Sequence, residues 1–499
     1  MRDHYARAEF AAAGDVYDAA VSSGAATSSD DDLLRARILL KHDENRAVAF
    51  LIGRPARGND RERRGQWALL LAIGYSRMRD FERADDNFAL AQRLLTAPSD
   101  KAQIAYHLAR RWLLEGRVGE AWSCADEMTR EKSVATKIAN QMLRSFIYCH
   151  EERYRDSAEV LIDVLTLMNK HRQEHLEEWF HAVQNLALLG RELSFDRAAT
   201  VARQEIDRDV EWPQDFNLQR FQALKAVGWT CALRGDMLGC FRYLRAAERV
   251  VPSKAFKAII SLDRAYFARI GGETHWCADE IAAAEALADE IDWNALQGEE
   301  RIGLLLFAEA TSTFALERSR YYLARYKNLD RMRSPLLLAA FDHRVEAMAA
   351  YTEGVVRLAA RDDKAEHAFR EAWVIFDRIG YDWRAARAAL RLFDVTKKTR
   401  WRHLAEDKLE GLPQSWLARE LTHARRTSEQ IPVRLPPMQH KVFSLLCQKF
   451  TTAEIAQHLG LSEHTVRNHL KAVFRAYGVK NRAALVAEAA NRGDLPALA

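Results

Sequence analysis

The stretch AEIAQHLGLSEHTVRNHL, residues 453–470, decides the fold of the C-terminal part of the chain. Thr451, just ahead of it, and Glu454 have the spacing of a capping box, in which a hydroxyl and a carboxylate close the start of a helix. Gly460 suits the left-handed turn at the end of a short helix, and Ser462 is a favoured N-cap for the next one. The spacing therefore predicts two helices joined by a tight turn.

The second of these helices is predicted to extend to Tyr477 and has two unlike faces. Its apolar residues follow the spacing i, i+4, i+7 and i+8, which places them on one side: Val466, Leu470, Val473 and Phe474. The opposite side carries Thr465, Arg467, Asn468, Lys471 and Arg475. Arginine and asparagine make paired hydrogen bonds to guanine and adenine in the major groove of B-DNA, and lysine adds charge. A polar helix face is most often merely solvated, but the two caps and the turn glycine favour DNA binding here.

Two further helices complete a small domain. Pro436–Pro437 favours the start of a helix over Met438–Lys449, and the turn Val479–Arg482 leads into a fourth helix over Ala483–Asn491. We expect the whole domain to span residues 431–496.

The charge of the chain is concentrated in this domain. From Val433 onward there are nine Lys and Arg against four Asp and Glu, whereas the preceding residues hold 65 against 66. The formal net charge of +4 therefore comes entirely from the tail. A basic appendage on a neutral body is typical of a nucleic-acid-binding protein.

The quoted stretch, followed by YGVKNR at residues 477–482, resembles the DNA-binding domain of LuxR/NarL-type response regulators and transcription factors over roughly 60 residues. The resemblance implies a four-helix helix-turn-helix fold. It also implies that the fourth helix, near Leu485 and Val486, forms a dimer face on a two-fold operator. The implied base contacts come from Arg467, Asn468 and Lys471. The implied phosphate contacts come from Thr452, Thr465, Lys480, Asn481 and Arg482. Ser462 and His469 complete the expected set of DNA-binding residues.

The sequence departs from that family at two places. The first helix usually carries Thr-x-x-Glu followed by another acid, whereas this chain has PPMQH at residues 436–440, so the usual internal salt bridge is missing. Ala453 also stands where a lysine is common. Both differences are expected to weaken or re-tune DNA binding without changing the fold.

The body, residues 1–426, repeats a pattern of helix pairs. Small and aromatic residues recur on one helix face, a short polar turn follows at Arg77–Asp80, and a second amphipathic helix begins. The pattern is clearest at Ala72, Tyr75, Ala84, Phe88 and Ala91, and it recurs at Ala109, Ala121 and Ala125, at Ser145, Ser157 and Leu161, at Gly228, Cys231, Cys240 and Leu244, at Ala265, Ala268, Ile281 and Ala284, and at Ala365, Phe369 and Ala372. It resembles the tetratricopeptide repeat of about 34 residues, with drifting spacings.

The predicted fold class is therefore all-α: a tetratricopeptide-like α-solenoid followed by the helix-turn-helix domain. A single bundle with one core of this size is the weaker alternative. Residues 427–437 hold three prolines in eleven positions and are expected to form a linker. The charged stretch Gly53–Gly65 is expected to be a solvated loop.

Several classes of function find no support in the sequence. No apolar run reaches the ~18 residues of a membrane span, and six scattered cysteines favour a reducing, cytoplasmic location. No GxxxxGK[ST], HExxH or GxSxG occurs, so we expect neither an enzyme nor a bound cofactor. In this respect the chain is similar to the sensor and DNA-binding parts of large MalT-like activators without their ATPase.

Two groups of side chains in the body are candidate sites. His171 and His175 would lie one turn apart on a helix beside Glu174 and Glu178, but a solvated face is favoured over a metal site. Cys231 and Cys240 fall on facing helices, where buried thiols are favoured over a redox pair. Eight aromatic residues fall mostly at packing positions, and some of them are expected to line a concave groove. The sequence does not sort the two groups: Trp67, Tyr75, Trp112, Trp179, Trp229, Trp276, Trp373 and Trp383.

Together these features predict a cytoplasmic, bacterial-type regulator that binds double-stranded DNA at a pseudo-palindromic operator as a homodimer. Its repeat body would hold a peptide, protein or small-molecule effector in its groove, and an activator would also contact RNA polymerase. The alternative is a repeat-based scaffold or adaptor protein with a weak or vestigial DNA-binding tail.

Overall fold

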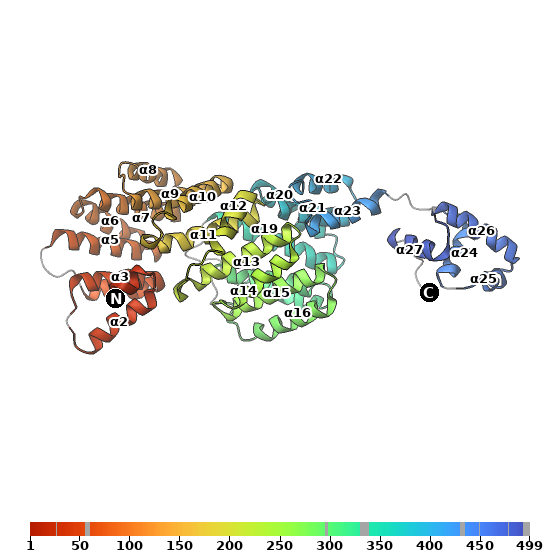
Figure 1. Ribbon diagram of the computed structural model, residues 1–499, viewed down its shortest axis with the longest axis horizontal. Coiled ribbons are helices and arrows are strands. Elements are labelled where there is room, and N and C mark those ends of the chain that lie inside the picture. Colours follow the sequence, from red (N-terminus) through yellow and green to blue (C-terminus); the bar gives the residue numbers. More distant parts are fainter. Residues whose placement is uncertain are drawn as a thin grey trace. The chain divides into compact units, whose positions relative to one another are not determined.

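The computed structural model divides the chain into two compact units, Met1–Leu417 and Ala418–Ala499. It describes residues 1–25, 27–54, 60–294, 298–329, 339–429, 435–448, 450–477 and 479–492. Within these ranges every regular element is a helix (Figure 1). None of the described helices combines the length and the apolar character needed to cross a membrane.

The first unit is a series of antiparallel helix pairs, each packed on its neighbours (Figure 1). The chain opens with α1 (Arg2–Ala6), α2 (Phe10–Ser22), α3 (Ser29–His42) and α4 (Glu44–Gly53). The pairs that follow are α5 (Arg61–Arg77) with α6 (Phe81–Leu94), α7 (Pro98–Leu114) with α8 (Val118–Met128), α9 (Val134–His150) with α10 (Tyr154–Met168), α11 (Leu176–Glu192) with α12 (Asp196–Ile206), α13 (Asn217–Leu233) with α14 (Met237–Glu248), α15 (Lys254–Ile270) with α16 (Thr274–Ala288), α17 (Ile302–Thr311) with α18 (Leu316–Lys327), α19 (Ala339–Ala359) with α20 (Ala365–Arg378), and α21 (Asp382–Thr396) with α22 (Thr399–Lys408). Short 3-10 turns lie at Arg172–Glu174, Gln214–Phe216 and Gly298–Arg301.

Six of these pairs share one local design. Their first helices, α5, α7, α9, α11, α13 and α15, are each 17 residues long and begin at residues 61, 98, 134, 176, 217 and 254. Two residues after each first helix, one residue adopts a left-handed conformation with φ between 53° and 82°: Arg79, Gly116, Glu152, Ser194, Gly235 and Gly272. A single left-handed residue ends the helix and turns the chain back, which makes the hairpin.

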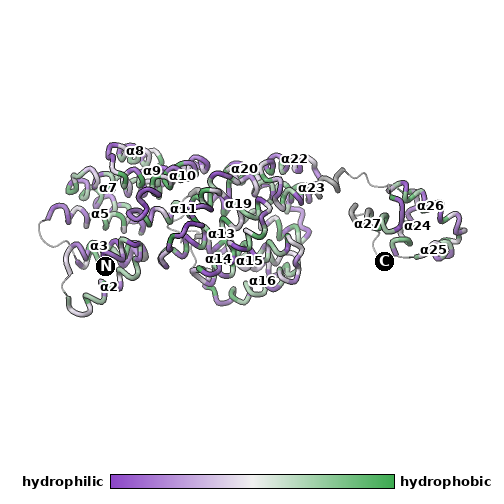
Figure 2. Tube along the Cα trace, in the orientation of Figure 1, coloured by the Kyte–Doolittle hydropathy of each residue, from purple (hydrophilic) through white to green (hydrophobic). Residues whose placement is uncertain are grey.

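Packing within the pairs follows the predicted small and large positions. Ala72, Ala84 and Phe88 are buried, and the same holds for the corresponding positions of later pairs: Ala109, Ala121, Ala125, Ser157, Leu161, Cys240, Leu244, Ala265, Ala284, Phe369 and Ala372. Apolar and polar residues alternate along the helices of this unit as amphipathic hairpins require (Figure 2). The predicted all-α class and the tetratricopeptide-like solenoid are confirmed.

Gly190 shows how closely the helices of one pair approach. A Cβ atom added to this α11 residue would lie 2.8 Å from the backbone nitrogen of Ala199 and 2.9 Å from its Cα, on α12. We expect Gly190→Ala to lower the free energy of unfolding by about 2 kcal/mol, since the backbones must separate. Urea denaturation followed by circular dichroism measures this change. The control is Gly119→Ala on α8, where a Cβ meets nothing within 4 Å. Equal stability of the two variants would contradict the close approach.

The solenoid also makes contacts that nearest-neighbour stacking does not require. Helix α11 touches α21, and α9 touches α19, so pairs far apart in sequence come together. An aromatic cluster reinforces this closure, because Trp229 of α13 lies 5.6 Å from Trp383 of α21 and 6.1 Å from Trp416, ring centroid to ring centroid. Trp416 begins α23 (Trp416–Glu429).

Several expectations differ from the structure or fall partly outside the residues that it describes. His171 and His175 do not share a helix: a 3-10 turn lies between them and α11 begins only at Leu176, so the helical spacing expected for them was wrong. No group of three or more His, Cys, Asp or Glu with metal-site geometry occurs within the described ranges. Residues 427–429 of the predicted linker belong to α23, Pro437 begins the next helix, and residues 430–434 lie outside the described part. Residues 55–59 of the charged loop and 493–496 of the tail also lie outside it.

Besides the part of α23 that it includes, the described residues of the second unit form four short helices around one small core (Figure 1). They are α24 (Pro437–Cys447), α25 (Thr452–Leu459), α26 (Glu463–Ala476) and α27 (Arg482–Arg492). The core residues come from all four: Val442, Phe443, Leu446, Ile455, Ala456, Val466, Leu470, Val473, Tyr477, Leu485 and Ala489. The four predicted helices are therefore present, with ends that shift by one or two residues.

Candidate nucleic-acid interface

The junction between α25 and α26 is fixed by side-chain caps. The amide of Thr451 donates to Glu454 Oε2 at 2.6 Å, and the amide of Glu454 donates to Thr451 Oγ1 at 3.3 Å, which completes the predicted capping box. Hydrogen bonds from the backbone and side chain of Thr451 hold the pKa of Glu454 below its usual value. Gly460 has φ of +63°, and Ser462 accepts from the amide of Thr465 at 3.1 Å. The angle between the two helices is thus set by local chemistry.

Helix α26 has one buried face and one exposed face. Val466, Leu470 and Val473 are buried in the small core. Arg467, Asn468, Lys471 and Arg475 are exposed, at the spacing of one helix side. An exposed row of guanidinium, amide and ammonium groups on a rigid helix is the donor set that base edges in a major groove accept.

Arg467 already has an acidic neighbour on its own helix. Its guanidinium donates to Glu463 Oε2 at 2.8 Å, one turn away, and both side chains are largely exposed. An exposed pair of this kind contributes only about 0.3–0.5 kcal/mol. Releasing Arg467 toward a base therefore costs little.

The other predicted contacts fall into two groups. Lys480 is exposed, and Thr452, Thr465 and His469 are half-buried near the surface of the same unit; Ser462 is exposed but its hydroxyl serves as the cap described above. Asn481 and Arg482 have structural partners.

The Oδ1 atom of Asn481 accepts from the amide of Ala484 at 2.8 Å, which caps α27. The half-buried Arg482 guanidinium donates to the carbonyl of Phe450. The bond ties the loop after α24 to the start of α27. Residues 480–482 were all expected to contact phosphate. Asn481 and Arg482 also make structural hydrogen bonds, whereas no such bond holds the Lys480 side chain among the described residues.

The fourth helix does not present Leu485 for pairing. Leu485 is fully buried in the core and Val486 is half-buried against it. The expected dimer face at Leu485 was wrong in this detail, because this side of α27 closes the domain. A partner would have to contact other residues of α27.

The absent first-helix acids are replaced by apolar packing. Phe443 of α24 stacks on Tyr477, with ring centroids 5.3 Å apart and an angle of 25° between the rings. Among the described side chains of α24–α27, the ion pair is the one between Arg467 and Glu463 on α26. The first helix is therefore held without the internal salt bridge usual in the resembled family.

The sequence pattern missed one residue of the exposed α26 face. His464 is exposed and lies one turn before Asn468, on the side of Arg467 and Lys471. Arg475, placed on this face from the sequence, is also exposed but was not among the predicted contacts. Counting one turn back from Asn468 would have found His464.

The thiols of the body have the environment of packing groups. Cys231 and Cys240 are buried and unbridged on α13 and α14, and burial raises the pKa of both thiols. A protonated, buried thiol is a poor nucleophile. Among the eight aromatic residues, Trp67, Tyr75, Trp179, Trp229 and Trp383 are buried, whereas Trp276 is exposed.

Comparison with known proteins bears on this C-terminal unit. Residues 434–489 match the family described as bacterial regulatory proteins, luxR family. The spore germination protein GerE of Bacillus subtilis (strain 168) is 44% identical over 61 residues, which are 12% of this chain and 82% of that protein. A solved structure titled "Crystal structure of APC/C hetero-tetramer Cut9-Hcn1" aligns with 97% of this chain and 88% of its own, at 15% identity. Its TM-score of 0.37 is too low to bear on the fold or the function.

The matched segment contains the capped turn, the exposed face of α26 and all the core residues from α24 to α27. The helix-turn-helix domain is thus the DNA-binding part of a transcription regulator. Through this domain, the chain belongs to the luxR family of bacterial regulatory proteins.

Proposed function

We propose that the chain is a sequence-specific transcription regulator that binds a pseudo-palindromic operator as a homodimer and whose repeat body responds to an effector. The observation that carries the proposal is the exposed row Arg467, Asn468 and Lys471 on a helix whose opposite face is fully packed. With α26 in the major groove, Arg467 and Asn468 read base edges and Lys471 adds an electrostatic contact.

Phosphate contacts position the domain on the duplex. Thr452, Thr465 and Lys480 supply a hydroxyl, a hydroxyl and an ammonium group near the ends of α25, α26 and α27. Helix N-termini favour phosphate through their free amides and dipole, and both α25 and α26 offer one. In this arrangement the regulator works in the cytoplasm, and an activating form contacts RNA polymerase beside its operator.

The scaffold reading remains the second candidate, with its own supporting observation. The repeat unit is much larger than the tail, and interfaces of stacked repeats commonly serve protein partners. On that reading the tail binds DNA weakly and without sequence preference.

Selection from a random double-stranded DNA pool by the full-length chain separates the two candidates. We expect enrichment of an inverted repeat whose half-site centres lie about 10 base pairs apart or a multiple of that distance. Sedimentation of the selected duplex with the protein should show two chains per site. Failure to enrich any sequence above non-specific binding would overturn the proposal in favour of the scaffold.

A further inference from the structure

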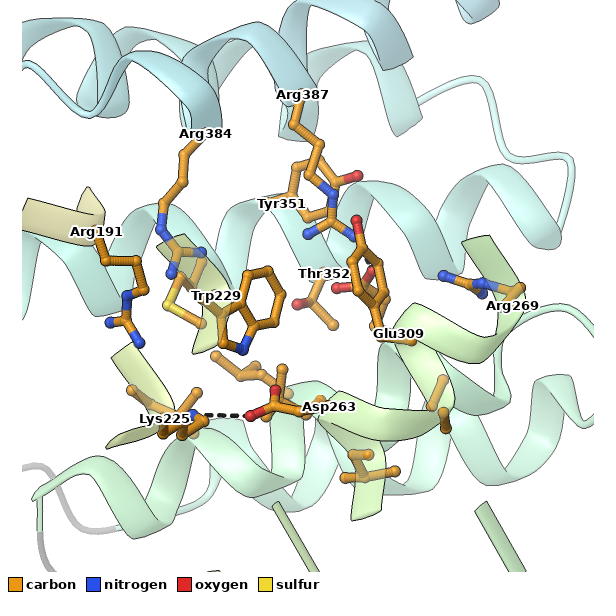
Figure 3. Close-up of a pocket in the computed structure, with 18 of the residues that line it drawn as sticks. Arg191, Lys225, Trp229, Asp263, Arg269, Glu309, Tyr351, Thr352, Arg384 and Arg387 are labelled. Atoms are coloured by element: carbon orange, nitrogen blue, oxygen red, sulfur yellow. Dashed lines mark hydrogen bonds and ion pairs between the residues drawn. The ribbon is translucent and has the colours of Figure 1, made fainter. Parts of the chain in front are cut away.

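A pocket lies inside the repeat unit where the solenoid closes on itself. Its walls come from α11, α13, α15, α16, α17, α19, α20 and α21, helices that span some 200 residues of sequence (Figure 3). With the open solvent at its mouth left out, the cavity volume is about 80 Å³.

Much of the wall is apolar and aromatic. Trp229 and Tyr266 stack with ring centroids 5.4 Å apart, and Tyr351 lies across the pocket on α19 (Figure 3). Leu262 and Met348 add aliphatic surface. Such walls exclude water around a bound molecule and strengthen any charged contact made there.

The charged part of the wall is strongly basic. Two carboxylates line the pocket, Asp263 and Glu309, and a third, Glu192, lies behind it. The six basic side chains that line it are Arg191, Lys225, Arg269, Arg344, Arg384 and Arg387.

Most of these charged side chains form ion pairs, and the number of cations per carboxylate differs from place to place. Lys225 Nζ lies 3.3 Å from Asp263 Oδ2, as the dashed line in Figure 3 marks, and Arg387 pairs with Glu309. One carboxylate therefore balances one cation in each of these two places.

At Glu192 more than one guanidinium group contacts a single carboxylate. Arg384 contacts it through two hydrogen bonds of 2.5 and 3.0 Å, and Arg191 contacts the same carboxylate. Arg344 approaches to 3.4 Å. All of these side chains are nine-tenths buried or close to it. Arg191 and Arg384 thus share one carboxylate, and a second guanidinium is expensive to keep in an apolar interior unless an anion accompanies it.

Arg269 adds a cation at the mouth. It is exposed near the end of α15 and lies across the pocket from Arg191 (Figure 3). None of the described acidic side chains forms an ion pair with it, and its guanidinium lies 5.5 Å from the Tyr266 ring centroid. A guanidinium held over an aromatic ring at a pocket mouth is well placed to receive an anionic group.

We propose that this pocket binds a small organic anion, a carboxylate or phosphate group carried on an apolar or aromatic body. The anionic group is received by Arg269 at the mouth, the body lies against Trp229 and Tyr351, and the buried arginines around Glu192 add positive charge on the opposite side. This site gives the effector of the proposed function a place and a chemical class, although binding at the pocket does not depend on the tail.

Fluorescent probes test the charge requirement directly. The anionic probe 8-anilinonaphthalene-1-sulfonate should bind the full-length chain, and N-phenyl-1-naphthylamine, which has the same ring system without the sulfonate, should bind at least tenfold more weakly. Arg269→Ala should weaken binding of the anionic probe about fivefold and Arg269→Glu about 20-fold or more. Arg93→Ala is the matched control, an exposed arginine that is likewise the penultimate residue of its helix, α6. Equal binding of the two probes, or equal effects of Arg269→Ala and Arg93→Ala, would overturn the proposal.

A second variant tests the location, and competition tests the head group. Ala310→Trp fills the pocket from α17 and should remove the binding of the anionic probe while circular dichroism stays unchanged. Displacement of the probe by benzoate supports a carboxylate ligand, and displacement by phenyl phosphate supports a phosphate ligand. Displacement by neither, or full binding to a folded Ala310→Trp variant, would contradict the pocket. DNA binding of the same variants is measured separately, so a failed pocket and a failed regulator remain distinguishable.

Discussion

Replacing Arg467 and Lys471 together by alanine is expected to lower the affinity for the selected operator about 100-fold or more. Each paired hydrogen bond from arginine to a base contributes about 1–3 kcal/mol of discrimination, and a lysine contact adds electrostatic attraction. Both side chains are exposed on α26, so their removal leaves the core of Val466, Leu470 and Val473 in place. Fluorescence anisotropy with the selected duplex and with a scrambled duplex measures the loss.

The control variant loses the same amount of positive charge, but from the repeat unit and not from the tail. Arg93→Ala with Lys101→Ala removes two positive charges from exposed positions of the repeat unit. This control should leave specific binding within about twofold of the wild type, because screening at physiological salt limits distant charges. If it weakens binding as much as the α26 variant does, the bulk charge of the chain and not the α26 face accounts for the affinity.

The salt dependence of the DNA affinity tests the phosphate contacts independently. Each phosphate-neutralising contact that is lost reduces the slope of log affinity against log salt by about 0.9. Thr452 and Thr465 carry no charge, so their alanine variants should reduce affinity without changing this slope. Lys480→Ala should change it by about one contact.

The C-terminal domain was predictable because its signals are local. The capping box at Thr451, the left-handed Gly460 and the Ser462 cap lie within a dozen residues, and each acts on its immediate backbone. What this local logic missed came from packing. Leu485 was placed on a dimer face but is buried. Arg482 bonds to the Phe450 carbonyl, 32 residues earlier, a contact that local spacing does not predict, and its phosphate contact stays a prediction.

The repeat body was predictable in its packing and at the polar turn Arg77–Asp80, whereas the other hairpin turns were not located from the sequence. Small residues such as Ala84 mark helix contacts because their size alone permits close approach. The turns depend on one left-handed residue each, and Arg79, Glu152 and Ser194 fill that position as well as glycine does in other pairs. A propensity for left-handed backbone is weak in these residue types, so the exact hairpin ends carry no sequence signal.

The pocket could not be predicted at all. Glu192 and Arg384 are separated by 192 residues, and they meet because the stacked pairs curve until α11 reaches α21. Curvature is the sum of small rotations between successive pairs, which no single motif encodes. Residues such as Arg191 and Arg344 therefore look like ordinary helix-surface charges in the sequence.

Glu192→Gln is expected to destabilise the repeat unit by about 3 kcal/mol at pH 7, because it leaves buried arginines without their carboxylate. Burial alone would raise the pKa of Glu192, but the charges of Arg191, Arg384 and Arg344 outweigh burial and hold the pKa far below its ordinary value of 4.5. Urea denaturation followed by circular dichroism measures the loss. Glu317→Gln is the control: Glu317 pairs with Arg320 at 2.7 Å on the exposed surface of α18, and its loss should cost under about 0.5 kcal/mol.

The pH dependence distinguishes the charge of Glu192 from its shape. A carboxyl whose folded pKa is lowered contributes stability that is fully present above its unfolded pKa and is lost as the pH falls toward the folded pKa. The gap between wild type and Glu192→Gln should therefore be constant from pH 7 to about 5 and should narrow below pH 4.5. A gap that does not narrow would mean that glutamine disturbs packing rather than charge.

Hydrogen exchange locates the damage, and the pocket supplies the last discriminating result. If Glu192 ties α11 to α19 and α21, its loss should speed exchange in those three helices and leave α5 to α8 unchanged, since stacked repeats act mainly on their neighbours. Removing this carboxylate also increases the surplus of positive charge beside the pocket. The anionic naphthalene probe should then stabilise Glu192→Gln more than it stabilises the wild type. Equal stabilisation of both would show that the arginines around Glu192 do not face the bound anion, and would leave Arg269 as the group that receives it.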